Sequence, residues 1–331
     1  MTVWWTVAGA FLLGALGTEM ARSYALRRGV LDVPGTRSSH TRPVPRGGGI
    51  ALVAASTVAL VVLWLSGRLP GWLAAAWTAP LAVALVGWID DHRHLSPALR
   101  LAVHLGAAAW LLFSIPVQPP GWAGWLFGVL GGAWVVNLYN FMDGIDGLAA
   151  AEAIFVCLAA GWLMDDQTRA LSGLTWAVAG ACAGFLPFNL PPARIFMGDV
   201  GSAFLGAVLV TLALAAQASD ALPLATWLVL GAVFWVDATY TLAVRLLRGQ
   251  RVWQPHRGHA YQILARRWGG HGRVTMAVLL YDALWLLPLA VWSEGDPHRG
   301  YWAVVMAAGP VLLLCLWSGA GRRPHDARAA V

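Results

Sequence analysis

The sequence contains no lysine and few charged residues of any kind. Its 22 basic residues are all arginines, and only 11% of the 331 residues are charged, whereas about a quarter are charged in a typical soluble domain. Hydrophobic residues make up 59% of the chain. This composition argues against a soluble globular protein and favours a chain that places its apolar surface in a lipid bilayer.

Several common signatures are also missing. The P-loop, the HExxH zinc site, the GxSxG elbow and the GxGxxG fingerprint are all absent, which excludes functions built on those motifs. The three cysteines, Cys157, Cys182 and Cys315, fall inside apolar runs and lack metal-ligand spacing. We therefore interpret them as buried and unpaired.

The net charge of +6 is compatible with nucleic-acid binding, but the arginines lie in short loops between apolar runs. That distribution is typical of a protein oriented in a membrane. We therefore expect a lipid bilayer as a partner and no nucleic acid.

Apolar runs of the length that spans a bilayer, roughly 20 residues, recur along the chain. They predict an all-α, polytopic integral membrane protein with about eleven transmembrane helices, forming one catalytic domain over 1–320 and a cytoplasmic tail over 321–331. The first run lacks a basic n-region and an A-x-A exit, so we expect it to be retained as a membrane helix. The predicted helices are 3–21, 48–66, 71–89, 98–115, 121–138, 147–164, 171–188, 201–217, 222–244, 274–292 and 301–318.

The arginines predict the orientation of these helices. Nineteen lie on one side of the predicted membrane, whereas only Arg68, Arg169 and Arg299 lie on the other. Since positive charge stays in the cytoplasm, we expect the N-terminus outside and the C-terminus inside. Five carboxylates from three separate loops then lie at cytoplasmic helix ends, which predicts one polar site at the inner interface: Asp90, Asp91, Asp143, Asp146 and Asp199.

The densest polar cluster is the stretch 137–147. Asn137 and Asn140 are three residues apart and share a helix face, and Asp143 and Asp146 follow in a glycine-containing turn. Amide and carboxylate oxygens are the ligands that Mg²⁺ prefers. The alternative is ordinary capping and turn chemistry, which explains fewer polar groups than are present.

Asp90 and Asp91 end the third predicted helix. Adjacent helical residues point about 100° apart, so both cannot face one ligand if the helix is regular. A solvated helix end is the alternative.

Asp199, in a G-D-x-G-S segment that opens the eighth helix, could be a plain N-cap or a metal ligand beside a phosphate-binding helix start. Phe196 offers a stacking surface for a flat base.

Two long basic loops contain further candidates. His256, Arg257 and His259 are suited to a diphosphate, although a purely cationic loop explains the arginine equally well. In the first loop, Arg46 belongs to a group of arginines before a glycine run that suits either an anion-binding lip or a surface facing lipid headgroups. Asp237 lies within a predicted membrane helix, where a carboxylate is a functional candidate by default and a structural pairing is the alternative.

Four motifs in order resemble a known family. They are N-x-x-N-F-M-D-G-x-D-G-L-A at 137–149, F-M-G-D-x-G-S at 196–202, the Asp-Asp pair at 90–91, and R-x-x-H-x-x-P-x-P-R-G-G-G at 37–49. Together they resemble the polyprenyl-phosphate N-acetylhexosamine-1-phosphate transferases of glycosyltransferase family 4, the WecA, WbpL and MraY type. The resemblance spans nearly the whole chain.

This resemblance implies transfer of a sugar-1-phosphate from a UDP-sugar to a polyprenyl (undecaprenyl) phosphate, with release of UMP and with Mg²⁺, or alternatively Mn²⁺, as cofactor. It implies Asp199 and Asn140 as metal ligands, and Asp146 and Phe196 at the nucleotide. Asp90 and Asp91 match the essential catalytic pair.

The resemblance also implies His256, Arg257 and His259 near the diphosphate. Here H-R-x-H-x-Y-Q replaces the more usual D-x-x-H-x-H-H, which favours the subgroup that initiates O-antigen synthesis. Asn137, Asp143, Arg46 and Asp237 are expected to support the site.

The implied location is the bacterial inner membrane, with the site on the cytoplasmic face. A homodimer is one alternative for the oligomeric state, the sugar is left open, and a transporter or lipid flippase is the competing function.

Overall fold

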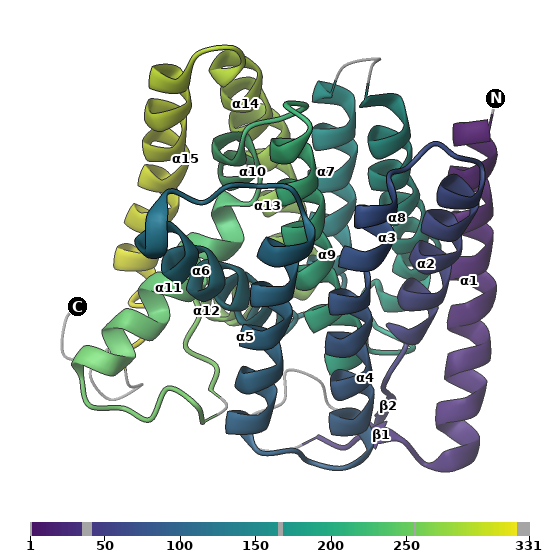
Figure 1. Ribbon diagram of the computed structural model, residues 1–331. Helices are drawn as coiled ribbons and strands as arrows, with labels where there is room; N and C mark the ends of the chain where they lie inside the picture. The colour runs from purple at the N-terminus through teal and green to yellow at the C-terminus, as the bar shows by residue number, and fades with distance from the viewer. Residues whose placement is uncertain (1, 35–41, 165–167, 255, 323–331) are drawn as a thin grey trace.

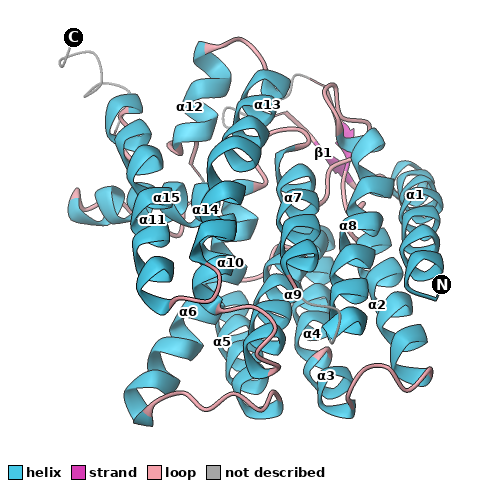
Figure 2. Cartoon of the chain, turned by 90° about the horizontal axis from the view of Figure 1, so that it is seen from above, coloured by secondary structure: helices cyan, strands magenta, loops and turns pink. Residues whose placement is uncertain are grey.

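Helices of similar direction pack side by side in the computed structural model, which describes residues 2–34, 42–164, 168–254 and 256–322 (Figure 1). The first and last long helices lie at opposite edges of the bundle in both views (Figures 1 and 2). In chain order the elements are α1 (Thr2–Arg28), β1 (Leu31–Asp32), β2 (Val44–Pro45), α2 (Ile50–Leu65), α3 (Gly71–Ala76), α4 (Thr78–His92), α5 (Pro97–Ser114), α6 (Gly121–Met142), α7 (Leu148–Leu163), α8 (Arg169–Asn189), α9 (Asp199–Ala218), α10 (Leu224–Leu230), α11 (Ala232–Leu247), α12 (Ala260–Arg267), α13 (His271–Tyr281), the π-helix η2 (Asp282–Leu286), α14 (Leu287–Ser293) and α15 (Pro297–Ser318).

The helices confirm an all-α, polytopic membrane protein. Within the described residues, eight helical stretches are long and apolar enough to cross a membrane, and α10 and α11 together make a ninth that is bent by 77°. Two further apolar helices, α2 and α7, are shorter. These segments coincide in position with the eleven predicted from the sequence. The number of true spans and their orientation stay predictions.

Helix α9 lies at the centre of the bundle. Its most apolar stretch is 89% buried within the protein, whereas the corresponding stretch of α1 is 28% buried. It packs against α2, α4, α5, α6, α8 and α10. Because these helices surround α9, side chains from several of them can contact the residues at its N-terminus.

A close helix approach brings α4 to the start of α9. A Cβ atom on Gly87 would lie 2.4 Å from the main-chain oxygen of Asp199 and 2.7 Å from the nitrogen of Val200. These are backbone atoms, so they cannot move aside as a flexible side chain could. The glycine therefore lets the end of α4, with Asp90 and Asp91, lie directly beside Asp199.

Gly87→Ala is expected to destabilise the protein by about 1–3 kcal/mol, the usual range for overpacking, and to separate α4 from α9. The measurement is thermal unfolding of the purified protein, with activity as a second readout. Gly106→Ala in α5 is the matched control, because a Cβ atom on Gly106 would have no neighbouring atom of the described residues within 4 Å. Equal unfolding temperatures for the two variants would contradict this account.

Candidate active site

The first long loop is joined to the segment before α9 by main-chain hydrogen bonds. Phe196 N donates to Pro45 O at 2.8 Å, Gly48 N to Phe196 O at 2.9 Å, and Gly49 N to Met197 O at 2.8 Å. The two-residue strands β1 and β2 pair antiparallel just before this point, with Asp32 opposite Val44. This ladder fixes Arg46 and Phe196 next to each other, although 150 residues separate them in the sequence.

Asp199 lies between two arginines. Arg46 Nη2 is 2.8 Å from Asp199 Oδ1, and Arg100 Nη1 is 2.8 Å from Asp199 Oδ2. Each arginine also pairs with one member of the Asp-Asp motif: Arg46 Nε lies 2.7 Å from Asp91 Oδ1, and Arg100 Nη1 lies 2.8 Å from Asp90 Oδ2. Three carboxylates and two guanidinium groups thus form one continuous charge network.

The two adjacent aspartates point to different partners, as their helical geometry requires. Asp91 is fully buried and accepts hydrogen bonds from the main-chain nitrogens of Asp199 at 2.9 Å and Val200 at 3.1 Å. It therefore caps α9 from another helix. Asp90 accepts from Leu95 N at 2.6 Å, pairs with Arg100 and also contacts the side chain of Asp199.

The charge state of Arg46 follows from this network. Burial alone would lower the pKa of its guanidinium, but the facing carboxylates of Asp91 and Asp199 outweigh burial, and the pKa is raised. Arg46 is therefore a permanent cation in the site.

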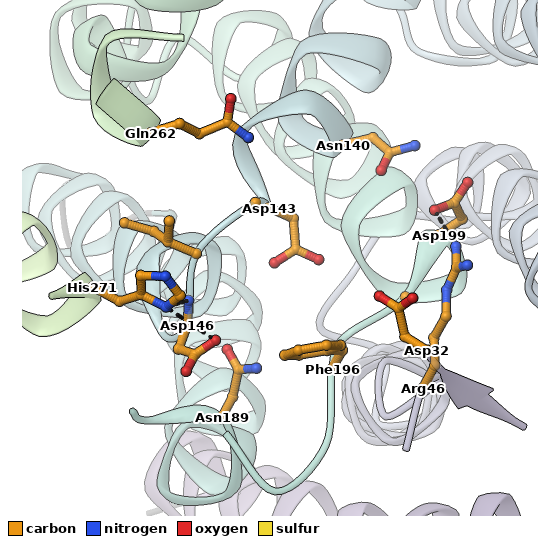
Figure 3. A pocket seen from close by; sticks show the side chains of 13 residues that line it. Asp32, Arg46, Asn140, Asp143, Asp146, Asn189, Phe196, Asp199, Gln262 and His271 are labelled. Atoms are coloured by element: carbon orange, nitrogen blue, oxygen red, sulfur yellow. Dashed lines mark hydrogen bonds and ion pairs between the residues drawn. The ribbon is translucent and has the colours of Figure 1, made fainter. Parts of the chain in front are cut away.

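A cavity of about 280 Å³ opens beside the network (Figure 3). Polar side chains from the first loop, α6, the 143–147 turn, the end of α8, the 196–199 segment, α12 and α13 line it. The lining residues are Asp32, Arg46, Asn140, Asp143, Gly144, Ile145, Asp146, Asn189, Phe196, Gly198, Asp199, Gln262 and His271.

Asp143 projects into the middle of this cavity (Figure 3). Burial raises the pKa of its carboxyl well above the ordinary range, and the negative charge of Asp199 raises it further. The neutral acid is thus favoured while no cation is nearby.

At the far end of the cavity, the carboxylate of Asp146 is held in place. Its Oδ2 accepts from Ala193 N at 3.1 Å, and its Oδ1 lies 3.3 Å from His271 Nδ1. Asn189 lies next to it and links the two neighbouring loops, accepting from Gly147 N and donating to Ile195 O at 3.0 Å each. The ring of Phe196 faces this end across the cavity (Figure 3).

The oxygen atoms that line the cavity suit a hard cation. Asp199, Asn140 and Asp143 offer carboxylate and amide oxygens, and Asn140 Oδ1 is oriented by a hydrogen bond from Ser202 Oγ at 3.1 Å. No group of three His, Cys, Asp or Glu side chains with metal-binding geometry occurs in the described residues. The carboxylate and amide oxygens themselves fit Mg²⁺, which is usually held by one or two carboxylates together with water and substrate phosphates.

The His-containing loop lies outside the cavity lining. His256 and His259 stack with ring centroids 4.8 Å apart, and His259 is buried, 3.4 Å from Asp237 Oδ1. Burial, followed by the neighbouring His259 and Arg245, lowers the pKa of His256 to about 3. It is therefore a neutral imidazole, and the predicted diphosphate role of His256, Arg257 and His259 stays a prediction.

The buried carboxylate of Asp237 is held by hydrogen bonds from neighbouring residues. It accepts hydrogen bonds from the main-chain nitrogens of Ala260 and Tyr261 at 2.9 and 3.0 Å and from Thr241 Oγ1 at 2.9 Å. It therefore caps α12 and fixes the loop that carries the histidines. This matches the structural pairing that the sequence left open.

Asn137 lies apart from the cavity lining. Asn137 donates to Ala133 O at 2.7 Å and hydrogen-bonds the buried side chain of His104, so it is directed into the helix packing. Arg37 and His40 of the first loop, and 323–331 of the predicted tail, lie outside the described residues.

The structure also adds site residues that the sequence analysis did not select: Arg100, Asp32, Asn189, Gln262 and His271. The sequence contained one clue to Arg100, because this residue lies ten positions after Asp90, at the start of the next helix. In the sequence it was only one of the many cytoplasmic arginines.

Comparison with known proteins agrees with the motifs in this site. The model of the family described as "Glycosyl transferase family 4" matches residues 73–217, which run from α3 to α9 and contain Asp90, Asp91, Asn140, Asp146 and Asp199. Over these residues the chain is similar to glycosyl transferase family 4.

Three named relatives are similar to longer stretches of the chain. The chain is 28% identical to the decaprenyl-phosphate N-acetylglucosaminephosphotransferase of Mycolicibacterium smegmatis, over 92% of this chain and 85% of the relative. It is 28% identical to the probable undecaprenyl-phosphate N-acetylglucosaminyl 1-phosphate transferase of Bacillus subtilis, over 75% and 73%. It is 33% identical to the phospho-N-acetylmuramoyl-pentapeptide-transferase of Nostoc sp., where the match covers 60% of this chain but only 58% of the relative's length.

Asp143→Asn is expected to stabilise the ligand-free protein at pH 7–8. Since the pKa of Asp143 is raised on folding, the carboxyl favours folding when protonated, and this contribution is lost as the pH rises. Asparagine imitates the neutral acid and should flatten the fall in unfolding temperature between pH 5 and 8. The exposed Asp220 provides the control variant Asp220→Asn. A lower unfolding temperature at pH 8 for Asp143→Asn than for the unaltered protein would contradict the assignment.

Proposed function

We propose that the chain transfers an N-acetylhexosamine-1-phosphate from a UDP-sugar to a polyprenyl phosphate and releases UMP. The observation that carries this proposal is the asymmetry of the cavity. One end has the network of Asp199, Arg46 and Arg100, suited to phosphate chemistry, and the other has Phe196 and Asp146, suited to a flat base that donates hydrogen bonds. The names of the relatives from Mycolicibacterium and Bacillus support the same reaction class.

This asymmetry orients the donor substrate. The uracil would stack on Phe196 and donate to the fixed carboxylate of Asp146, which leaves the diphosphate directed toward Asp199. Phosphoryl transfer depends mainly on positioning and on neutralising charge at the transferring group. The two guanidinium groups are suited to that task, because each presents several N–H donors to phosphate oxygens.

In the proposed reaction, an oxygen of the carrier phosphate attacks the β-phosphorus of the UDP-sugar. The bond from that phosphorus to the bridging oxygen breaks, and UMP leaves with the electron pair. Asp91 is assigned a positioning role, because its oxygens are occupied by Arg46 and by the start of α9. Asp90, held by Arg100 at the edge of the network, is the better placed of the pair to orient the attacking phosphate.

Asp199 and Asn140 would hold Mg²⁺, with Mn²⁺ as the alternative. The cation, when bound, would neutralise charge on the diphosphate and on the departing UMP. Both oxygens of Asp199 are paired with arginines, so an arginine that gives up its share of this carboxylate becomes available to a substrate phosphate. Asp143 lines the same cavity and would offer a further oxygen ligand.

The proposed place of the reaction is the cytoplasmic face of a bacterial inner membrane, where a soluble nucleotide meets a lipid phosphate. The product would start the synthesis of a cell-envelope polysaccharide of the O-antigen kind, as the H-R-x-H-x-Y-Q loop suggests. A homodimer stays a prediction. The transporter hypothesis depended on Asp237 as a coupling carboxylate, and the capping of α12 by Asp237 gives this residue another task.

The test is UMP release by the purified protein in lipid nanodiscs, with undecaprenyl phosphate and a panel of UDP-N-acetylhexosamines. We expect release to require both Mg²⁺ and the carrier, and Asp199→Asn to lower it on the order of 100-fold or more, as for removal of a group that stabilises transition-state charge. Asp220→Asn, with the same chemical change at an exposed position, should keep full activity. Full activity of Asp199→Asn, or no UMP with any donor, would refute the proposal.

A further inference from the structure

We propose that His271 is a positioning residue for the nucleotide subsite, and that it acts by fixing the carboxylate of Asp146. This inference rests on the proposed function, because it takes the ligand at this end of the cavity to be a uridine nucleotide. His271 opens α13, which lies outside the 73–217 stretch matched by the family model.

Helix α13 contacts three polar groups of Asp146. The Nδ1 atom of His271 accepts a hydrogen bond from the main-chain nitrogen of Asp146 at 3.3 Å, and it also lies 3.3 Å from the Oδ1 atom of Asp146. One turn further along the helix, Thr275 Oγ1 shares its proton between the main-chain oxygen of Asp146 at 3.4 Å and that of His271 at 3.3 Å. Since residues four apart lie on one helix face, a single polar face of α13 contacts both the backbone and the side chain of this aspartate.

The same side of the helix is anchored deeper in the bundle. Seven residues after Thr275, at the start of η2, the carboxyl group of Asp282 interacts electrostatically with that of Glu152 on α7. Both carboxyl groups are almost wholly buried, and none of the described residues gives their oxygens a hydrogen bond. Helix α13 itself packs against α7, the helix that follows the Asp146 turn.

These contacts confine Asp146 on two sides. Ala193 N donates to Oδ2 at 3.1 Å. His271, whose side chain is only 17% exposed, accepts from the main-chain nitrogen and lies against Oδ1. Figure 3 shows the imidazole beside Asp146, on the side away from Phe196. The lone pairs that remain free are therefore directed toward the cavity, where a base stacked on Phe196 would present its N–H group.

Equilibrium binding of UMP to the purified protein isolates this effect, because it requires neither carrier nor catalysis. We expect His271→Phe, which keeps a ring but removes both nitrogens, to weaken UMP binding roughly tenfold, the effect of losing one hydrogen bond that holds Asp146. His271→Asn, whose amide reaches the same position as Nδ1, should stay within about threefold of the unaltered protein. Thr275→Val should weaken UMP binding by a smaller factor.

Steady-state kinetics adds a readout that a merely structural role would not produce. The KM for the UDP-sugar should rise by the same factor as the UMP dissociation constant in His271→Phe, while kcat and the KM for the carrier stay unchanged. His298→Phe is the matched control, since His298 is exposed at the start of α15. Unfolding temperatures identify variants that fail to fold, in which case Thr275→Val decides.

The outcomes separate this inference from the proposed function. Wild-type affinity for UMP in both His271→Phe and Thr275→Val overturns the role of His271 and leaves the transferase proposal intact. A fall in kcat in His271→Phe with unchanged UMP affinity also overturns it. Absence of UMP binding by the unaltered protein overturns both.

Discussion

The whole site depends on one carboxylate, Asp199, placed between two arginines at the start of the most buried helix. Three carboxylates would repel one another so strongly in a poorly solvated place that they need compensating positive charge nearby. Arg46 and Arg100 supply it from two different segments. These ion pairs therefore hold the first loop, through Arg46, and α5, through Arg100, against the start of α9. The same two arginines place positive charge beside the cavity, where it would attract an anionic substrate.

The backbone makes this arrangement possible. Gly87 lets α4 approach the first turn of α9, and Gly198, with φ of 76°, turns the chain in a conformation that L side chains rarely adopt. A side chain there would also collide with the carboxylate of Asp91. The glycines next to the acidic residues are thus part of the site, because they set the distances over which the charges interact.

The sequence predicted the helices and the gathering of acidic residues well, because apolar length and positive-charge asymmetry are properties of the chain itself. It predicted pairings poorly. Arg100 and His271 looked like ordinary members of basic loops, and only the packing of α5 and α13 brings them to Asp199 and Asp146. For Asp237 the sequence left a functional role and a structural pairing open, because its contact with the start of α12 joins residues more than twenty positions apart.

The most direct test of this account is Mn²⁺ binding to the purified protein, measured by electron paramagnetic resonance. The account predicts a single Mn²⁺ site that Mg²⁺ displaces, that Asp199→Asn abolishes and that Asp220→Asn leaves intact. Equal Mn²⁺ stoichiometry and affinity in Asp199→Asn and the unaltered protein would contradict the central place given to Asp199.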